Sequence, residues 1–283
     1  MNTNFLYYLG LAIISIILLI YVCYKIGVRQ GLLTFFAMVG LGYLIEAVIF
    51  NLLNSYQYYP NIIKRDPIYD STLGAIVSNA LSLPVAATYL AAFRKNWVWI
   101  LCTVALFAGI EWLFLRVDIY KHHWWKIGYT SMGLPFYFYS AKFLYKKMAH
   151  PLEGILHAIC LFLIISPFSG SFQFTPIMIF SNRYYDFGWF MDRSRDTVAF
   201  AALFYLCSSL FYVAITRLFH HRRKWGKYIL TPFTMLFANI LLKKIGILHS
   251  LVWWDTSYYV LISILSVLLT EIISKNLNNG PST

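Results

Sequence analysis

Charged residues are scarce in this chain, and acidic residues are the scarcest. Only 12% of its 283 residues are charged, against about a quarter in a typical soluble domain. Asp and Glu together number 11, whereas 60% of the residues are hydrophobic. This composition excludes an ordinary soluble domain and predicts an all-α, polytopic integral membrane protein whose main partner is the lipid bilayer.

Motifs for metal or cofactor binding are also missing. The four cysteines form no CxxC pair, which excludes a zinc ribbon and gives no disulfide framework. The sequence contains no Walker loop, GxSxG elbow, kinase signature, dinucleotide-binding glycine motif or haem motif. We therefore expect no cofactor and no metal site.

The net charge of +12 comes from short basic clusters between apolar stretches. The positive-inside rule explains such clusters without a nucleic-acid partner, and we expect none. The first 25 residues form an apolar run without a basic leader region or a small-residue cleavage site. We expect this run to be a retained first helix and not a signal peptide.

Apolar windows of about 20 residues predict about nine membrane helices in a single membrane domain over 1–283. The segment 169–181 is too short to span, follows Pro167 and contains Pro176, which favours a re-entrant or interfacial piece. The tail 276–283 is polar. The predicted spans are 5–25, 31–54, 71–93, 97–117, 124–146, 151–167, 196–217, 226–246 and 251–274.

The distribution of Lys and Arg predicts the orientation. With the N-terminus outside, the inner loops are short, carry more Lys and Arg than the outer loops, and contain one acid, Glu153. The longer connections 55–70 and 182–195 then lie outside. We expect a multi-pass protein of the cell (plasma) membrane with a cytoplasmic C-terminus.

Self-similarity predicts an internal repeat. Trp97 and Trp225 each follow a basic cluster, and the pairs Trp124-Trp125 and Trp253-Trp254 follow them at nearly the same spacing. This favours two parallel four-helix units, 31–147 and 151–275, after a first helix in 1–30. The alternative is that any two helical hairpins share aromatic belts and basic inner loops.

The stretch from Leu73 to Lys147 contains SNALSLPVAATYLAAF, an IEW motif and a basic HHWW corner. Over roughly the first 150 residues it resembles a family of uncharacterised small membrane proteins, of about five spans, in spore-forming Gram-positive bacteria. The resemblance implies a bacterial membrane protein, and it implies no activity because that family has no established one.

Ionisable residues inside spans are costly and therefore mark candidate sites. Glu271 lies near the inner end of its helix and is expected at the interface. Four other polar residues lie at similar depth, about 9–12 Å below the outer edge at 1.5 Å per helical residue. We interpret them as a ligand-binding layer for a small solute, ion or lipid, or as hydrogen-bonding groups that hold helices together. They are Glu46, Asn79, Glu111 and Asn239.

The outer corner after Glu111 is the second candidate site. If it were helical, the spacing of Asp118 and His122 would bring a carboxylate beside an imidazole. A membrane enzyme acting on a lipid or isoprenoid could then use His122 or His123 as base and Glu111 as its partner. Histidines beside paired tryptophans at a membrane surface are otherwise interfacial anchors.

The strongest inner basic cluster contains Arg222, Arg223 and Lys224. It predicts a binding site for anionic lipid head groups, or it only sets the topology. Three functions therefore follow from the sequence: solute binding or passage at the polar layer, a membrane-embedded enzyme, and a structural or accessory subunit.

Overall fold

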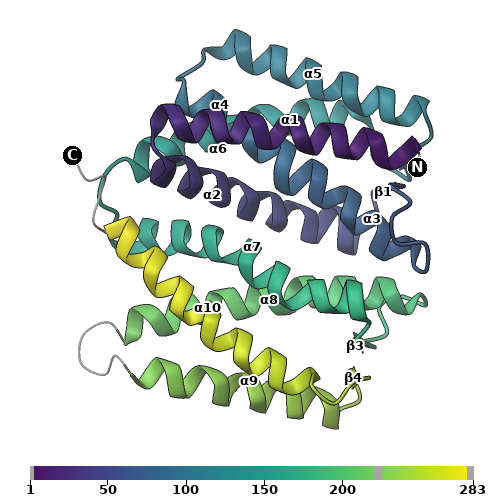
Figure 1. Ribbon diagram of the computed structural model, residues 1–283, viewed down its shortest axis with the longest axis vertical. Coiled ribbons are helices and arrows are strands. Elements are labelled where there is room, and N and C mark those ends of the chain that lie inside the picture. Colours follow the sequence, from purple (N-terminus) through teal and green to yellow (C-terminus); the bar gives the residue numbers. More distant parts are fainter. Residues whose placement is uncertain (1–2, 220–224, 279–283) are drawn as a thin grey trace. The chain divides into compact units, whose positions relative to one another are not determined.

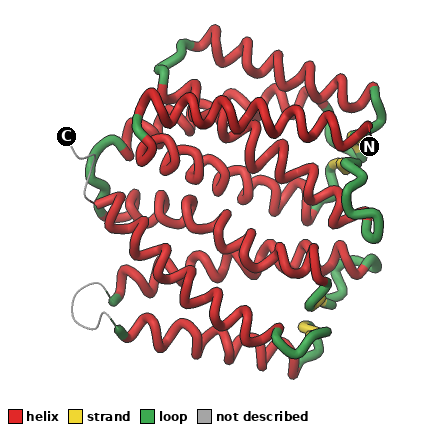
Figure 2. Tube along the Cα trace, viewed as in Figure 1, coloured by secondary structure: helices red, strands yellow, loops and turns green. Residues whose placement is uncertain are grey.

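The computed structural model describes residues 3–219 and 225–278, and helices account for most of them (Figures 1 and 2). The chain divides into two compact units. We call Met1–Leu152 unit 1 and Glu153–Asn279 unit 2. The division after Leu152 lies two residues inside the predicted second repeat unit, 151–275, and the first helix belongs to unit 1.

Unit 1 is an antiparallel bundle with two short strands at one end (Figure 1). Two of its long helices contain π-helical turns, η1 and η2, which interrupt the regular α-helical hydrogen bonding. Its elements are α1 (Thr3–Ile26), α2 (Val28–Glu46), η1 (Ala47–Leu52), β1 (Tyr56–Tyr58), α3 (Pro67–Ala75), η2 (Ile76–Ser82), α4 (Leu83–Ala92), α5 (Trp97–Arg116), β2 (Tyr120–His122) and α6 (Ile127–Met148).

Unit 2 has a similar order of helices and strands. Its elements are α7 (Gly154–Phe180), β3 (Arg183–Tyr185), α8 (Arg193–Leu218), α9 (Gly226–Lys244), β4 (Leu248–Ser250) and α10 (Asp255–Asn278). In each unit, two loops between helices each contribute one short strand, and the two strands pair antiparallel. In unit 1 β1 pairs with β2, and in unit 2 β3 pairs with β4.

The loops beside the strands are held by the same kinds of contact in both units. Asp70 accepts hydrogen bonds from three consecutive backbone N–H groups of the loop before α3, and Asp196 does the same for the loop before α8. Three further hydrogen bonds of unit 1 each have a counterpart in unit 2. The bond from Tyr59 N to Ile119 O corresponds to that from Asp186 N to Ile247 O, and the bond from His123 N to Ser55 O corresponds to that from Leu251 N to Asn182 O. The bond from Tyr58 N to Ser71 Oγ corresponds to that from Tyr185 N to Thr197 Oγ1.

Seven helical stretches of the described chain are long and apolar enough to cross a membrane, which fits a multi-pass membrane protein. They are α1, α2 with η1, α3 to α4, α5, α7, α8 and α10. The sequence also predicts spans at α6 and α9, which fall outside this group. The mean hydropathy of α6 is lowered by its Tyr, Ser and Gly residues, and that of α9 by polar residues such as Lys227, Asn239 and Lys243.

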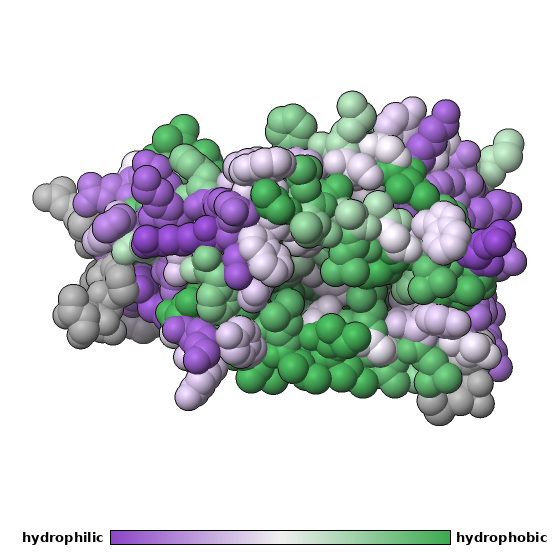
Figure 3. Space-filling view, turned by 90° about the horizontal axis from the view of Figure 1, so that it is seen from above, coloured by the Kyte–Doolittle hydropathy of each residue, from purple (hydrophilic) through white to green (hydrophobic). Residues whose placement is uncertain are grey.

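The surface supports this interpretation. Hydrophobic side chains gather over the middle of the helices and hydrophilic ones toward their ends (Figure 3). Helices α1 and α5 leave most of their apolar residues uncovered by the rest of the chain. Such faces are stable when lipid covers them.

The prediction that 169–181 is a separate re-entrant or interfacial piece was wrong. Helix α7 continues without a break from Gly154 to Phe180 and contains both Pro167 and Pro176. A proline removes one N–H donor from the helical ladder, and neighbouring helices stabilise the helix around it. Helices α8 and α10 pack along α7 and supply that support.

Candidate functional site

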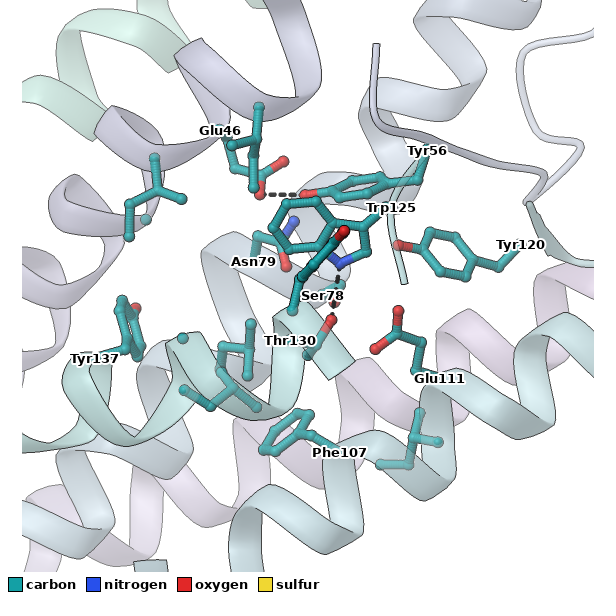
Figure 4. A pocket seen from close by; sticks show the side chains of 18 of the residues that line it. Glu46, Tyr56, Ser78, Asn79, Phe107, Glu111, Tyr120, Trp125, Thr130 and Tyr137 are labelled. Carbon is teal, nitrogen blue, oxygen red and sulfur yellow. Dashed lines mark hydrogen bonds between the residues drawn. The ribbon is translucent and has the colours of Figure 1, made fainter. Parts of the chain in front are cut away.

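A partly open cavity of about 190 Å³ lies in unit 1. Because strand residues line it, it lies toward the end of the unit that carries β1 and β2 (Figure 4). Its walls come from α1, α2, η1, η2, α4, α5 and α6 as well as from both strands. The polar side chains in its lining are Glu46, Tyr56, Tyr58, Ser78, Asn79, Glu111, Tyr120, Trp125, Tyr129, Thr130 and Tyr137.

Glu46 is the last residue of α2, immediately before the π-helical turn η1. The Tyr56 hydroxyl donates a hydrogen bond of 2.5 Å to Glu46 Oε1 (Figure 4). The other carboxylate oxygen, Oε2, is buried and makes no hydrogen bond in the described part of the chain, and the Asn79 side chain is a second neighbour of this carboxyl group. Because a buried acceptor without a donor is costly, a donor from a bound molecule would stabilise it.

Asn79 lies in the other π-helical turn, η2, and its Nδ2 lies 3.4 Å from the Tyr58 hydroxyl. Helix α2 approaches η2 closely at Gly42, where a Cβ atom would lie 3.0 Å from the Asn79 carbonyl oxygen. Both Glu46 and Asn79 therefore lie at π-helical turns, which occur frequently at functional sites.

Three tyrosines on the strands form one wall of the cavity. The Tyr58 and Tyr120 ring centroids are 4.7 Å apart, and Tyr56 lies 5.6 Å and 5.4 Å from them. Burial raises the pKa of Tyr56 and Tyr58 well above the usual value of about 10, and the Glu46 carboxylate raises both further. The phenols therefore stay neutral and can donate or accept hydrogen bonds.

Glu111, on α5, faces the cavity from another helix and contacts His122. His122 Nε2 lies 2.7 Å from Glu111 Oε1, and the two side chains are 17% and 9% exposed. The corner after α5 is not helical, because Asp118 has a φ of 54° and His122 belongs to β2. The pairing of Asp118 with His122 depended on a helical corner, and this condition is not met.

The remaining sequence candidates lie elsewhere. His123 Nδ1 lies 2.9 Å from the Asn54 carbonyl oxygen, on an exposed loop. Asn239 is buried in unit 2, where its Nδ2 donates to the Met235 carbonyl of its own helix, and it is not among the residues lining the cavity. Arg222, Arg223 and Lys224 lie outside the described residues.

Glu271, near the end of α10, is bonded by two lysines. Its carboxylate lies 2.5 Å from Lys227 Nζ and 2.9 Å from Lys275 Nζ, and it accepts a hydrogen bond from Tyr228. This acid is therefore part of a local ion-pair network and is not part of the cavity.

The electrostatics of the cavity are one-sided. Glu46 and Glu111 bring two carboxyl groups to the lining, and no Lys or Arg is among the residues that form it. Its remaining polar groups are neutral hydroxyls, an amide and an indole. Sequence reasoning missed Tyr56, Tyr58 and Tyr120, although the alternating tyrosines of Tyr56–Tyr58 are the pattern expected when one face of a strand is buried.

Comparison with family models, with curated proteins and with solved structures gives no match.

Proposed function

We propose that unit 1 binds a small solute in the cavity between Glu46 and Glu111. One observation carries the proposal: Glu46 Oε2 is buried beside an open volume and makes no hydrogen bond in the described chain. A cavity with mostly apolar walls and a few convergent polar groups is the usual form of a small-molecule site. In this proposal the solute supplies the missing donor.

We further propose that nine helical stretches of the described chain cross a bacterial cell membrane, namely the seven apolar ones together with α6 and α9, with the N-terminus outside and the C-terminus in the cytoplasm. The strand ends of both units then face outward, and solute enters the cavity from outside. In a variant without native cysteines, Lys64→Cys should react with an impermeant maleimide on intact cells, and His150→Cys only after lysis. The reverse pattern would contradict this orientation.

We also propose that units 31–147 and 151–275 arose by duplication. The support is the set of matched hydrogen bonds beside the strands, together with the paired roles of Asp70 and Asp196. Backbone contacts of this kind do not follow from shared aromatic belts or basic loops. The first helix, in 1–30, is then an addition to the first copy.

A cavity-filling variant tests solute binding. Gly133 lies on the α6 face formed by Thr130, Leu134 and Tyr137, and a Cβ atom placed there meets no atom within 4 Å. Gly133→Leu should fill part of the cavity and still fold, since Leu favours helix over Gly by about 0.5–1 kcal/mol. Gly109→Leu is the matched control, because Gly109 is exposed on α5, has similar space and does not line the cavity.

The measurement is the thermal unfolding of purified protein in nanodiscs with a panel of small polar solutes. A bound solute at 100 times its Kd stabilises the folded state by about 2.7 kcal/mol. Solutes that stabilise wild type and Gly109→Leu should leave Gly133→Leu unchanged. Equal stabilisation of all three proteins would place the solute elsewhere, and no stabilisation by any solute would favour an accessory subunit.

The contact between His122 and Glu111 favours a second candidate, a membrane enzyme acting on a lipid or isoprenoid. A carboxylate beside an imidazole orients the ring and supports general-base chemistry. Purified protein would be incubated with a lipid extract and the products followed by mass spectrometry. His122→Ala should abolish a product that His123→Ala leaves intact, whereas equal products from both variants would remove the proposed base.

A further inference from the structure

Unit 2 carries a buried cation at the position that corresponds to the edge of the cavity in unit 1. In the strand pairs, Tyr56 is opposite His122 and Arg183 is opposite Ser250. Tyr56 and Arg183 each lie two residues before the strand tyrosine, Tyr58 or Tyr185, whose N–H donates to a hydroxyl on the next helix. Arg183 is therefore the counterpart of Tyr56.

The Arg183 guanidinium donates hydrogen bonds from all three of its nitrogens and lies over one aromatic ring. Its Nε and Nη2 donate to the two oxygens of Asp255 at 2.8 and 2.9 Å, and its Nη1 donates to the Tyr185 hydroxyl at 3.1 Å. Its central carbon lies 3.3 Å from the centroid of the Tyr259 ring. The Arg183 and Asp255 side chains are both 0% exposed.

The unit 2 residue at the position of Glu46 is linked to this guanidinium through Tyr259. Gln173 precedes Arg183 by the same interval that separates Glu46 from Tyr56, so a neutral amide replaces the carboxylate. Tyr259 extends from α10 and donates a hydrogen bond of 2.6 Å to the Gln173 carbonyl. At the corresponding position of unit 2, side chains thus enclose a cation.

Unit 1 has the opposite distribution of charge. Its cavity holds Glu46 and Glu111 and no Lys or Arg in its lining. The buried acceptor Glu46 Oε2 makes no hydrogen bond in the described part of the chain, like its counterpart Gln173 Oε1, but it belongs to a carboxyl group and not to an amide. The phenols of Tyr56 and Tyr58 add hydroxyl oxygens and ring faces, which favour a cation as the Tyr259 ring does in unit 2. An anion would meet the Glu46 and Glu111 carboxyl groups there, and His122, which lies outside the lining, is already bonded to Glu111.

We propose that the unit 1 cavity takes a small organic cation with N–H donors, of the alkylguanidinium or primary alkylammonium class. The cationic head binds Glu46 Oε2 and the tyrosine hydroxyls, and the alkyl part lies against Phe107 and Leu134. A bare metal ion fits less well, because the described residues include no group of three His, Cys, Asp or Glu side chains that could hold one. The inference rests on the proposed function of the same cavity.

Titration calorimetry with four probes of similar size tests this proposal. The probes are propylguanidinium, its neutral isostere propylurea, tetramethylammonium, which has no N–H donor, and butyrate. Wild type should bind propylguanidinium at least tenfold more tightly than each of the others. If propylurea binds as tightly as propylguanidinium, the ligand need not be a cation, and the proposal that the cavity binds a solute still stands. If none of the four probes binds, both the cation proposal and the solute-binding proposal are overturned.

Two further outcomes decide the chemistry. Equal binding of tetramethylammonium would overturn the role of N–H donors, and tighter binding of butyrate would overturn the sign of the charge. Glu46→Gln should weaken propylguanidinium about ten- to one-hundredfold, because a charge-assisted hydrogen bond is lost. Glu153→Gln removes the same charge from an exposed site outside the cavity and should bind as wild type does. The probe ranking in wild type decides the proposal even if Glu46→Gln fails to fold.

Discussion

Replacing Asp255 by Asn should destabilise the protein by about 3–5 kcal/mol, because it leaves the Arg183 guanidinium buried without a counter-ion. The structure sets this magnitude. Both side chains are 0% exposed, and the Asp255 carboxylate accepts hydrogen bonds from Arg183, Asn182 and Ser250. Asn supplies one acceptor oxygen and turns an amide N–H₂ toward groups that are themselves donors.

The charge on Arg183 persists over the accessible pH range. Burial lowers the pKa of its guanidinium, but Tyr185, Tyr259 and the Asp255 carboxylate outweigh burial, so its pKa lies above the usual value. The destabilisation by Asp255→Asn should therefore be the same at pH 6 and pH 9. Combining it with Arg183→Met removes the unpaired cation and should recover about 2 kcal/mol or more of the loss.

The assay is unfolding in mixed micelles with increasing dodecyl sulfate, followed by far-ultraviolet circular dichroism. Lys275→Met is the control, because Lys275 is 65% exposed in its pair with Glu271 and an exposed pair of this spacing contributes only about 0.3–0.5 kcal/mol. A loss below about 1 kcal/mol for Asp255→Asn, or a double variant as unstable as the sum of its two single changes, would refute the reasoning.

Three other predictions follow from the contacts in the fold. Gly74→Ala should destabilise by about 1–3 kcal/mol, because its Cβ would lie 2.4 Å from the Tyr58 Cβ, whereas Gly10→Ala meets no atom within 4 Å and should not; equal thermal stability of the two variants would contradict this packing. Burial raises the pKa of Tyr58, so the unfolded chain loses that proton near pH 10 before the folded chain does, and stability falls as pH rises above about 10. Tyr58→Phe should make this decline shallower between pH 9 and 11, and an unchanged slope would count against a buried neutral phenol. Asp70→Asn and Asp196→Asn should each cost about 1–3 kcal/mol in chemical unfolding, since each carboxylate accepts three loop N–H groups; a loss in only one variant would contradict their matched roles.

The helical, membrane-compatible architecture could be predicted from the sequence because apolar windows of spanning length are a strong signal. The continuation of α7 to Phe180 could not be predicted from the sequence. Pro167 and Pro176 mark breaks in most helices, and only the packing of α8 and α10 along α7 lets one helix continue through both. The same limitation concealed η1 and η2, which have no sequence signature of their own.

The site was only partly predictable. Counting residues along helices placed Glu46, Asn79 and Glu111 at similar depth, and the structure brings all three to one cavity. The same counting included Asn239, which lies in unit 2, because depth alone does not say which helices share an interior.

The periodicity of apolar residues does not predict the contacts that the loops and short strands make. The partner of Glu111 is His122 on a strand, and Tyr120–His122 shows no alternation like that of the tyrosines in Tyr56–Tyr58. The tyrosine wall depends on the register of β1 against β2, which the sequence of either strand alone does not fix.

A structure of the protein determined with propylguanidinium tests directly whether the unit 1 cavity binds a small organic cation. We predict ligand density in the unit 1 cavity, with a guanidinium nitrogen within hydrogen-bond distance of Glu46 Oε2 and the propyl chain toward Phe107. Density confined to another part of the protein, or an empty cavity at a concentration that saturates binding, would contradict it.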